Sequence, residues 1–197
     1  MIPDPQEPAD ADLIRHAARG DKAAYEVLVK RHYQKIFSLA MNMVQNEADA
    51  LDLAQETFVK AWRNLGKFRG QSSFTTWLHR ITVNLGIDLF RKRKHRIEIG
   101  LDRVLPAREN EADRARITDP GPHPSAGLQR RELRETINQA LARLSPEHRA
   151  VIVLREFEEM DYNQIAETVG CSTGTVMSRL FYARRHLQKL LRDKYER

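Results

Sequence analysis

Small, polar and basic side chains recur on one side of a segment near the C-terminus, at positions that a helix would align. They face away from an apolar stripe that contains Val176, Leu180 and Ala183. A helix that begins with small residues can come close to base edges in the DNA major groove, where hydrogen bonds distinguish the four base pairs. The residues on this side are Gly174, Met177, Ser178, Phe181 and Arg185.

A shorter helix is predicted just before this segment. Asp161 caps it together with Gln164, three residues later, as in a capping box. Gly170 ends it, because glycine enters the left-handed conformation without a Cβ clash, and Ser172 begins the next helix. Two helices joined by so tight a turn indicate a helix-turn-helix motif. The alternative is an ordinary helical hairpin that packs on its neighbours.

A helix predicted from about residue 48 to 65 carries a polar face. Asp52, Gln55 and Glu56 stand at i, i+3 and i+4 and share it. Because the protein is basic, we interpret this face as a docking surface for a basic partner; a solvated helix face is the alternative. The nearby acids Glu47 and Asp49 do not complete a metal site, since no histidine or matching carboxylate helix accompanies them.

The loop from Gly66 to Ser73 holds Arg69 between two aromatic side chains, Phe68 and Trp77. Such a loop suits the capture of an unstacked base, because stacking on an aromatic ring contributes about 1–3 kcal/mol. Its composition alone favours the alternative, a plain turn between helices with both rings in the core.

Ser73 caps a further helix that is predicted to run to about Phe90. Arg80, Asn84 and Arg91 share one side of it and lead into residues 91–96, where five of six residues are Lys or Arg. We interpret this run as phosphate contacts. A solvated charge run is the alternative.

The composition indicates a soluble, intracellular protein with a polyanionic partner. Its 197 residues include 33 Lys and Arg against 27 Asp and Glu, for a net charge of +6. Cys171 is the single cysteine, so no internal disulfide is expected. A single cysteine also fits a location in the reducing cytoplasm. No segment reaches the length of an apolar membrane span, and residues 1–12 lack the order of a signal peptide. No membrane insertion is therefore expected.

The apolar periodicity predicts an all-α protein made of two small helical domains joined by a flexible linker. We expect a disordered tail over residues 1–11, a first domain over 12–96 and a second over 128–197. The linker, residues 97–127, mixes acids with bases, and its proline- and glycine-rich end is predicted to hold no helix. Whether the two domains pack together in the free chain stays open at this point.

Several motifs occur in a characteristic order, and they cover both predicted domains. They are Asp49–Trp62, Phe68–Gly70, Phe74–Leu78, Val83–Asn84, Leu144–Arg149 and Cys171–Leu180. Together they resemble a bacterial RNA polymerase sigma factor of the extracytoplasmic-function (ECF) group. The resemblance implies a factor that brings core RNA polymerase to promoters, with no enzymatic activity and no cofactor, in a stress or envelope response.

The resemblance also implies a role for each set of residues. Leu51, Asp52, Gln55, Glu56 and Phe58 would bind the coiled coil of the largest polymerase subunit. The helix after Ser145 would meet the flap of the second-largest subunit. The minus-10 promoter element would be contacted by Arg69, Gln71, Ser72, Ser73, Arg80, Asn84, Arg91 and Lys92. The minus-35 element would be contacted by Ser172, Thr173, Gly174, Met177, Ser178, Phe181, Arg184 and Arg185.

Two features depart from the pattern of the family. Met177 and Tyr182 stand where relatives often place basic residues, and the linker carries several acids, such as Glu109 and Glu111. An anti-sigma factor is an expected further partner. The competing functions are a simple helix-turn-helix repressor or activator, which has no use for the Asp52 and Glu56 face, and an enzyme acting on nucleic acid. For the enzyme, the sequence shows no metal motif, no nucleophile with a positioned base and no phosphate-binding glycine loop.

Overall fold

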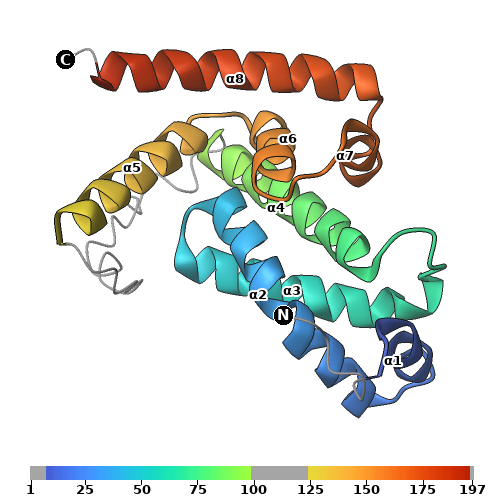
Figure 1. Cartoon of the computed structure of the whole chain (residues 1–197). Coiled ribbons are helices and arrows are strands. Elements are labelled where there is room, and N and C mark those ends of the chain that lie inside the picture. The colour runs from blue at the N-terminus through green and yellow to red at the C-terminus, as the bar shows by residue number, and fades with distance from the viewer. Residues whose placement is uncertain (1–7, 99–123, 196–197) are drawn as a thin grey trace.

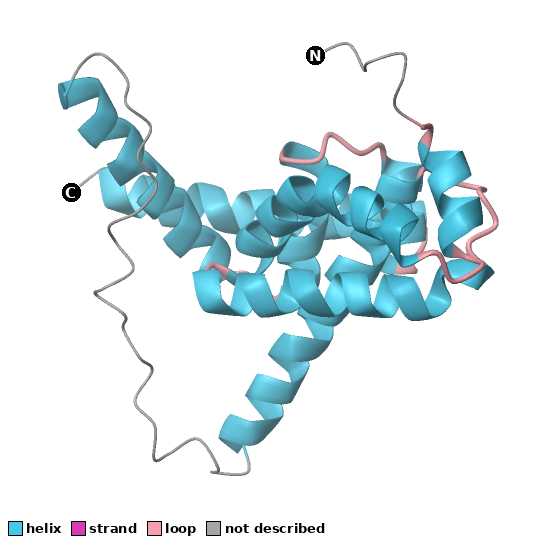
Figure 2. Ribbon diagram, turned by 90° about the horizontal axis from the view of Figure 1, so that it is seen from below, coloured by secondary structure: helices cyan, strands magenta, loops and turns pink. Residues whose placement is uncertain are grey.

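The computed structural model describes residues 8–98 and 124–195, and within these ranges it contains helices and loops without a strand (Figures 1 and 2). The all-α prediction is therefore confirmed. The predicted tail, 1–11, and linker, 97–127, lie largely outside the described residues. No helix of the described part is both long and apolar enough to cross a membrane. The elements are α1 (Asp10–Ala17), α2 (Lys22–Val44), α3 (Glu47–Asn64), the 3-10 helix η1 (Leu65–Lys67), α4 (Phe74–Glu98), α5 (Pro124–Ala142), α6 (Pro146–Glu156), α7 (Tyr162–Val169) and α8 (Thr173–Tyr195).

Side-chain caps explain where most of these helices begin. Ser73 Oγ accepts a hydrogen bond from the Thr76 amide at 3.0 Å, and Ser145 Oγ accepts one from the His148 amide at 3.3 Å. Each bond satisfies one of the amide groups that a helix start leaves without an internal partner. Both caps were predicted from the sequence and are confirmed.

Two helix boundaries differ from the predictions. α4 continues to Glu98, so the basic run from Arg91 to Arg96 is helical. α5 already begins at Pro124, within a stretch predicted to hold no helix. That prediction was wrong because proline is well tolerated in the first turn of a helix, where its missing amide hydrogen has no partner to lose.

Helices α1 to α4 enclose a first hydrophobic core. Its fully buried side chains include Leu28, Ile36 and Leu78. Two buried hydroxyls tie α3 to α4 inside this half: Thr57 Oγ1 donates to Thr82 Oγ1 at 3.2 Å, and Thr82 Oγ1 donates to the Leu78 carbonyl of its own helix. The first half of the chain thus forms a complete helical unit.

A second core crosses from the first half into the C-terminal half. It contains Met43 of α2 and Val83 of α4 together with Val151 and Leu154 of α6 and Leu180 of α8. Figure 1 shows α4 lying between the α2–α3 pair and the C-terminal helices, and α4 contacts both α6 and α7. The two halves therefore pack together through apolar surface, which we call the packed arrangement.

Arg149 lies at the centre of this contact and is 4% exposed. Its Nε donates to the Leu141 carbonyl at 2.9 Å and its Nη2 to the Ala142 carbonyl at 2.8 Å, at the end of α5. Its Nη1 donates to the Met43 carbonyl at 2.6 Å, in the last turn of α2, and its guanidinium lies 4.6 Å from the ring centroid of Phe90. One cation thus satisfies carbonyls at the negative ends of two helices from different halves. Burial lowers the pKa of Arg149 to about 10, so it stays charged at neutral pH.

His79 of α4 and Glu158 of the α6–α7 loop meet at the same contact, with Nε2 and Oε2 3.5 Å apart. His79 is 4% exposed, and both ring nitrogens lack a hydrogen-bond partner. Burial, with smaller effects of Lys35 and His32, lowers the pKa of His79 to about 4. Burial raises the pKa of Glu158, against an opposing effect of Lys35. The imidazole is therefore neutral at pH 7, and the close approach is not an ion pair.

Replacing Arg149 should destabilise the protein strongly. Arg149→Met keeps much of the apolar stem but removes three charge-assisted hydrogen bonds, and it leaves buried carbonyls at two helix ends without this donor. We expect the free energy of unfolding in urea to fall by about 3 kcal/mol or more. Arg143→Met, at an exposed position nearby, is the control and should change it by less than about 0.5 kcal/mol. Equal effects of the two substitutions would contradict this account of Arg149.

Stability should also fall in mild acid because of His79. As pH drops from about 6.5 to about 4, the unfolded chain takes up the imidazole proton before the folded chain does. The free energy of unfolding then decreases by about 3 kcal/mol from this group, while the raised pKa of Glu158 offsets part of the decrease. His79→Leu should flatten the decline in urea titrations between these pH values. A decline of unchanged size in that variant would show that His79 is not its source.

Candidate nucleic-acid interface

Helices α7 and α8 form the helix-turn-helix that the sequence predicts. Asp161 Oδ1 accepts from the Gln164 amide at 2.9 Å, and the Gln164 side chain accepts from the Asp161 amide at 3.0 Å, which completes the capping box. Gly170 ends α7 in the left-handed conformation, with φ of 68°. Ser172 Oγ then accepts from the Thr175 amide at 3.1 Å and begins α8. Each of these local predictions is confirmed.

The first half of α8 presents one side to solvent. Val176, Leu180 and Ala183 are buried against α6 and α7, whereas Met177 and Phe181 are 53% and 60% exposed. Of the predicted minus-35 residues, Ser172, Gly174, Ser178, Arg184 and Arg185 are also exposed, and Thr173 is half-buried. α8 therefore offers an accessible face of small, apolar and basic side chains, as a major-groove helix requires.

Hydrogen bonds restrain several members of this face. Ser178 Oγ donates to the Thr175 carbonyl at 3.0 Å, and Arg184 lies 2.7 Å from Glu156 at the end of α6. Arg185 is exposed one helical turn after Phe181, on the same face of α8. Phe181 and Tyr182 add two exposed rings in edge contact, with centroids 5.4 Å apart.

The predicted minus-10 residues fall into two neighbouring groups. Arg69 and Gln71 are exposed in the loop before α4, and Ser72 is half-buried there. Ser73 is exposed, but its hydroxyl is used as the cap of α4. Beneath the loop, Phe68 packs against Trp77 with a ring-centroid distance of 5.2 Å, so both rings are half-buried at the edge of the core.

Along α4, Arg80, Asn84 and Lys92 are exposed. Arg91 is exposed as well, but it pairs with Glu147 of α6 at 3.2 Å in the packed arrangement. That ion pair joins a predicted minus-10 residue to the C-terminal half of the chain. Arg91 therefore shares its charge between Glu147 and Asp88, which lies 3.9 Å away on its own helix.

An apolar groove of about 570 Å³ lies between α2 and α3. Phe58 is buried at its floor, and Leu51 and Val59 stand at its rim, 45% and 43% exposed. Asp52 and Glu56 are exposed beside it. The sequence indicated an acidic docking face here, whereas the structure adds a large apolar component that the sequence reasoning missed. This apolar component is supplied by Tyr25, Val29, Tyr33 and Trp62.

Helix α6, which begins after Ser145, is enclosed on both sides. Residues 149–154 are all buried, because α2 and α4 cover one side of the helix and α7 and α8 cover the other. A partner can reach the buried residues 149–154 only if the helices that cover them move away. Among the described residues, no cluster of His, Cys, Asp and Glu is arranged to hold a metal ion.

Each half of the chain matches a region of the same protein family. Residues 28–96 match the family described as Sigma-70 region 2, and residues 134–187 match Sigma-70, region 4. The chain is 36% identical to RNA polymerase sigma-H factor of Pseudomonas aeruginosa over 189 residues, covering 92% of this chain and 93% of that protein. It is 34% identical to ECF RNA polymerase sigma factor SigW of Bacillus subtilis over 180 residues, covering 91% and 95%.

Two solved structures resemble the fold over most of its length. One is CnrH in complex with the cytosolic domain of CnrY, with a TM-score of 0.63, 28% identity, and coverage of 94% of this chain and 99% of that one. The other is the sigma factor RpoE in complex with the anti-sigma factor NepR from Bartonella quintana, with a TM-score of 0.64, 27% identity, and coverage of 85% and 96%. With two matched regions in order and relatives that align over more than nine-tenths of both chains, the chain belongs to the sigma-70 family, in its ECF group of RNA polymerase sigma factors.

Proposed function

We propose that this protein binds core RNA polymerase in the cytoplasm and directs it to specific promoters, as a transcription initiation factor without enzymatic activity of its own. The observation that carries the proposal is the presence of both sigma regions, in order, on one chain. The names of the relatives support a role in a stress or envelope response. The two structural neighbours with bound CnrY and NepR support an anti-sigma factor as a further partner.

The α2–α3 groove is the surface we assign to the coiled coil of the largest polymerase subunit. Leu51 and Val59 at its rim provide the apolar area, and because 45% and 43% of their surface is still exposed, a partner that covers them would gain about 1 kcal/mol from each. Asp52, Gln55 and Glu56 surround that contact with polar and acidic groups, which suit a basic partner and favour its approach. Phe58 is buried and forms the floor of the groove, so it would support the contact from beneath.

Promoter DNA is assigned to two other surfaces. The exposed face of α8 would read the minus-35 element through hydrogen bonds and apolar contacts in the major groove. The loop before α4, with Arg80 and Asn84 on the helix, would meet the minus-10 element after the strands separate. Extruding a base costs a few kcal/mol, which binding to polymerase and to the loop must offset.

The packed arrangement must open for these surfaces to work together. The minus-35 and minus-10 elements are named for positions about 25 base pairs apart. Because duplex DNA rises about 3.4 Å per base pair, the two elements are separated by about 85 Å along the DNA. α4 and α8 both pack on α6 and α7, so their axes lie within about 20 Å of each other at these contacts. Opening would also uncover α6 for the flap of the second-largest subunit.

Promoter-directed transcription with purified core polymerase tests the proposal. The chain should support initiation from a promoter library, and Leu51→Asp with Val59→Asp should weaken polymerase association on the order of 100-fold or more, because charges would enter an apolar contact. Leu133→Asp, an apolar-to-acid change at an exposed position of α5, is the control and should have little effect. Normal pull-down of polymerase by the double variant would instead favour a helix-turn-helix regulator that does not use this groove.

Fluorescence energy transfer tests the opening. In a Cys171→Ser background, dyes on His16→Cys of α1 and Glu167→Cys of α7 report the distance between the two halves. Transfer should be high in the free chain and fall when core polymerase is added. A pair within the first half, His16→Cys with Arg63→Cys, should not change. Transfer that stays high in a complex competent for transcription would refute the opening.

A further inference from the structure

His32 of α2 forms hydrogen bonds through both of its ring nitrogens and joins three helices. Its Nε2 lies 2.8 Å from Asp10 Oδ2 in the first turn of α1, and its Nδ1 lies 3.2 Å from Thr75 Oγ1 in the first turn of α4. Because a carboxylate can only accept, Nε2 donates to Asp10, and in the neutral ring this leaves Nδ1 to accept from the Thr75 hydroxyl. The two partners are 22 and 43 residues away in the sequence, so both bonds are long-range contacts.

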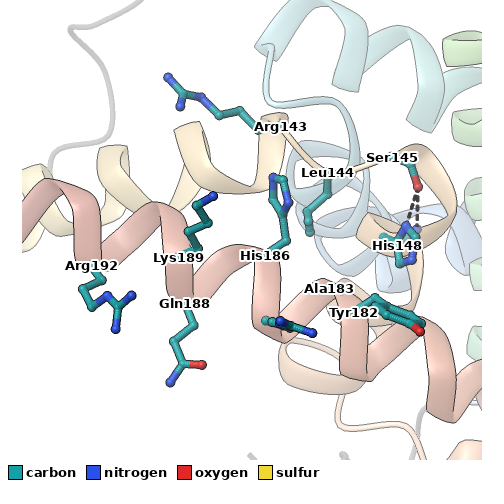
Figure 3. A pocket seen from close by; sticks show the side chains of 11 residues that line it. Arg143, Leu144, Ser145, His148, Tyr182, Ala183, His186, Gln188, Lys189 and Arg192 are labelled. Carbon is teal, nitrogen blue, oxygen red and sulfur yellow. Dashed lines mark hydrogen bonds between the residues drawn. The ribbon is translucent and has the colours of Figure 1, made fainter.

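A second histidine makes a similar contact, but its effect is local. His148 Nδ1 lies 2.7 Å from Ser145 Oγ, three residues earlier, and both residues line a groove of about 700 Å³ beside α8 (Figure 3). That bond stays within the start of α6. His32 is 8% exposed and its partners come from two other helices, so it fixes the arrangement of α1, α2 and α4.

His32 also supports the aromatic cluster at the start of α4. Its ring packs edge-on against Phe74, with centroids 5.2 Å apart, and Phe74 is 4% exposed. Phe74 in turn contacts Phe68 and Trp77, each at a centroid distance of 5.8 Å. Phe68 precedes Arg69 in the loop before α4, so rings on both sides of the exposed loop residues are supported through Phe74 by His32.

The loop before α4 has little buried surface of its own to hold its shape. Residues 69–71 are all exposed. The conformation of such a segment depends on where its ends are held, because few contacts stabilise its middle. At the second end, Ser73 caps α4, and the next two residues, Phe74 and Thr75, are the ones that His32 contacts.

Resting on the function proposed above, we propose that Asp10, His32 and Thr75 act as one positioning unit for the loop before α4, and that this unit determines how selectively the loop captures a base of the minus-10 element. The three residues act through the loop and do not themselves contact DNA. A loop held in the binding geometry loses less free energy on capture, and this matters where extruding the base already costs a few kcal/mol. Helix α1, which carries none of the residues assigned to polymerase or DNA, thereby contributes to promoter selectivity.

The test is transcription with core polymerase from a promoter library that is randomised in both elements, followed by sequencing of the transcripts. In Thr75→Val and in Asp10→Ala, the enrichment of preferred minus-10 bases should fall on the order of fivefold, as expected for the loss of one hydrogen bond. Asp10→Asn keeps an acceptor for His32 and should retain the parent preference. Enrichment at minus-35 and affinity for core polymerase should stay unchanged in all three variants.

Two control substitutions separate positioning from stability. Thr82→Val removes a fully buried hydroxyl from α4 two turns after Thr75, and Asp12→Ala removes an acid of α1 that pairs with Arg15. Both should leave the minus-10 preference unchanged, even where urea unfolding shows Thr82→Val to be as destabilising as Thr75→Val. Because Asp10 and Thr75 act through the same ring, combining Asp10→Ala with Thr75→Val should weaken the preference no further than the larger single effect.

The possible results are distinct. An unchanged minus-10 preference in Thr75→Val and Asp10→Ala would overturn the proposal. An equal loss at minus-35 would also contradict it, because a general structural effect is not confined to one element. Effects that multiply in the double variant would show that Asp10 and Thr75 do not form one unit. An active parent whose variants keep its preferences removes the positioning unit alone, whereas a parent that supports no initiation removes the proposed function and this proposal with it.

Discussion

The buried guanidinium of Arg149 is the contact on which the arrangement of the two halves depends. α2 and α5 both end close to it, and the carbonyls of a helix end carry partial negative charge that needs a donor. Without a cation between them, these two ends would be buried with unpaired acceptors. Arg149 comes from the start of α6, so the same bonds fix α6 against both helices. The apolar residues that follow it can then continue the core of the first half.

This packing links stability to partner binding. Residues 150–154 of α6 are apolar and buried, and α2 and α4 cover part of this stretch. A polymerase subunit that binds α6 must therefore replace contacts that already exist, and its apparent affinity is reduced by the free energy of separating the halves. Binding at the α2–α3 groove does not require the free energy of separating the halves, because this groove is accessible in the packed arrangement. If polymerase uses both surfaces as proposed, it would engage the first half before the second.

Local structure was predictable from the sequence where it depends on neighbouring residues. The capping box of Asp161 with Gln164, the left-handed Gly170 and the cap at Ser145 are decided within a few residues, and each was predicted correctly. What covers a helix is decided at long range. The period of α6 marks Val151 and Leu154 as buried but does not say that Met43 and Val83 lie against them. An arginine such as Arg149 is normally exposed, and no local signal marks it as the partner of a distant carbonyl.

In the candidate site, too, features set by local spacing were predictable and features set by long-range packing were not. Asp52 and Glu56 were found because charges on one helix face follow from spacing alone. The sequence could not identify Tyr25, Tyr33 and Trp62 as groove residues, because an apolar side chain has the same helical period whether it faces the core or a shallow groove. Only the placement of α2 beside α3 shows that these rings line an open surface.

The distribution of charge along α8 suggests how this protein balances affinity against selectivity. In the turns that can enter the major groove, Met177 and Phe181 are exposed and carry no charge, so this part can read apolar features such as thymine methyl groups. Apart from the half-buried Arg179, the cations of α8 lie from Arg184 onward, further from the start of the helix. Phosphate contacts from these cations would strengthen binding to any duplex equally, so they would raise affinity without changing which sequence is preferred. Selectivity would then depend on a few apolar and hydroxyl contacts, and the strength of binding on a separate, salt-sensitive surface of the same helix.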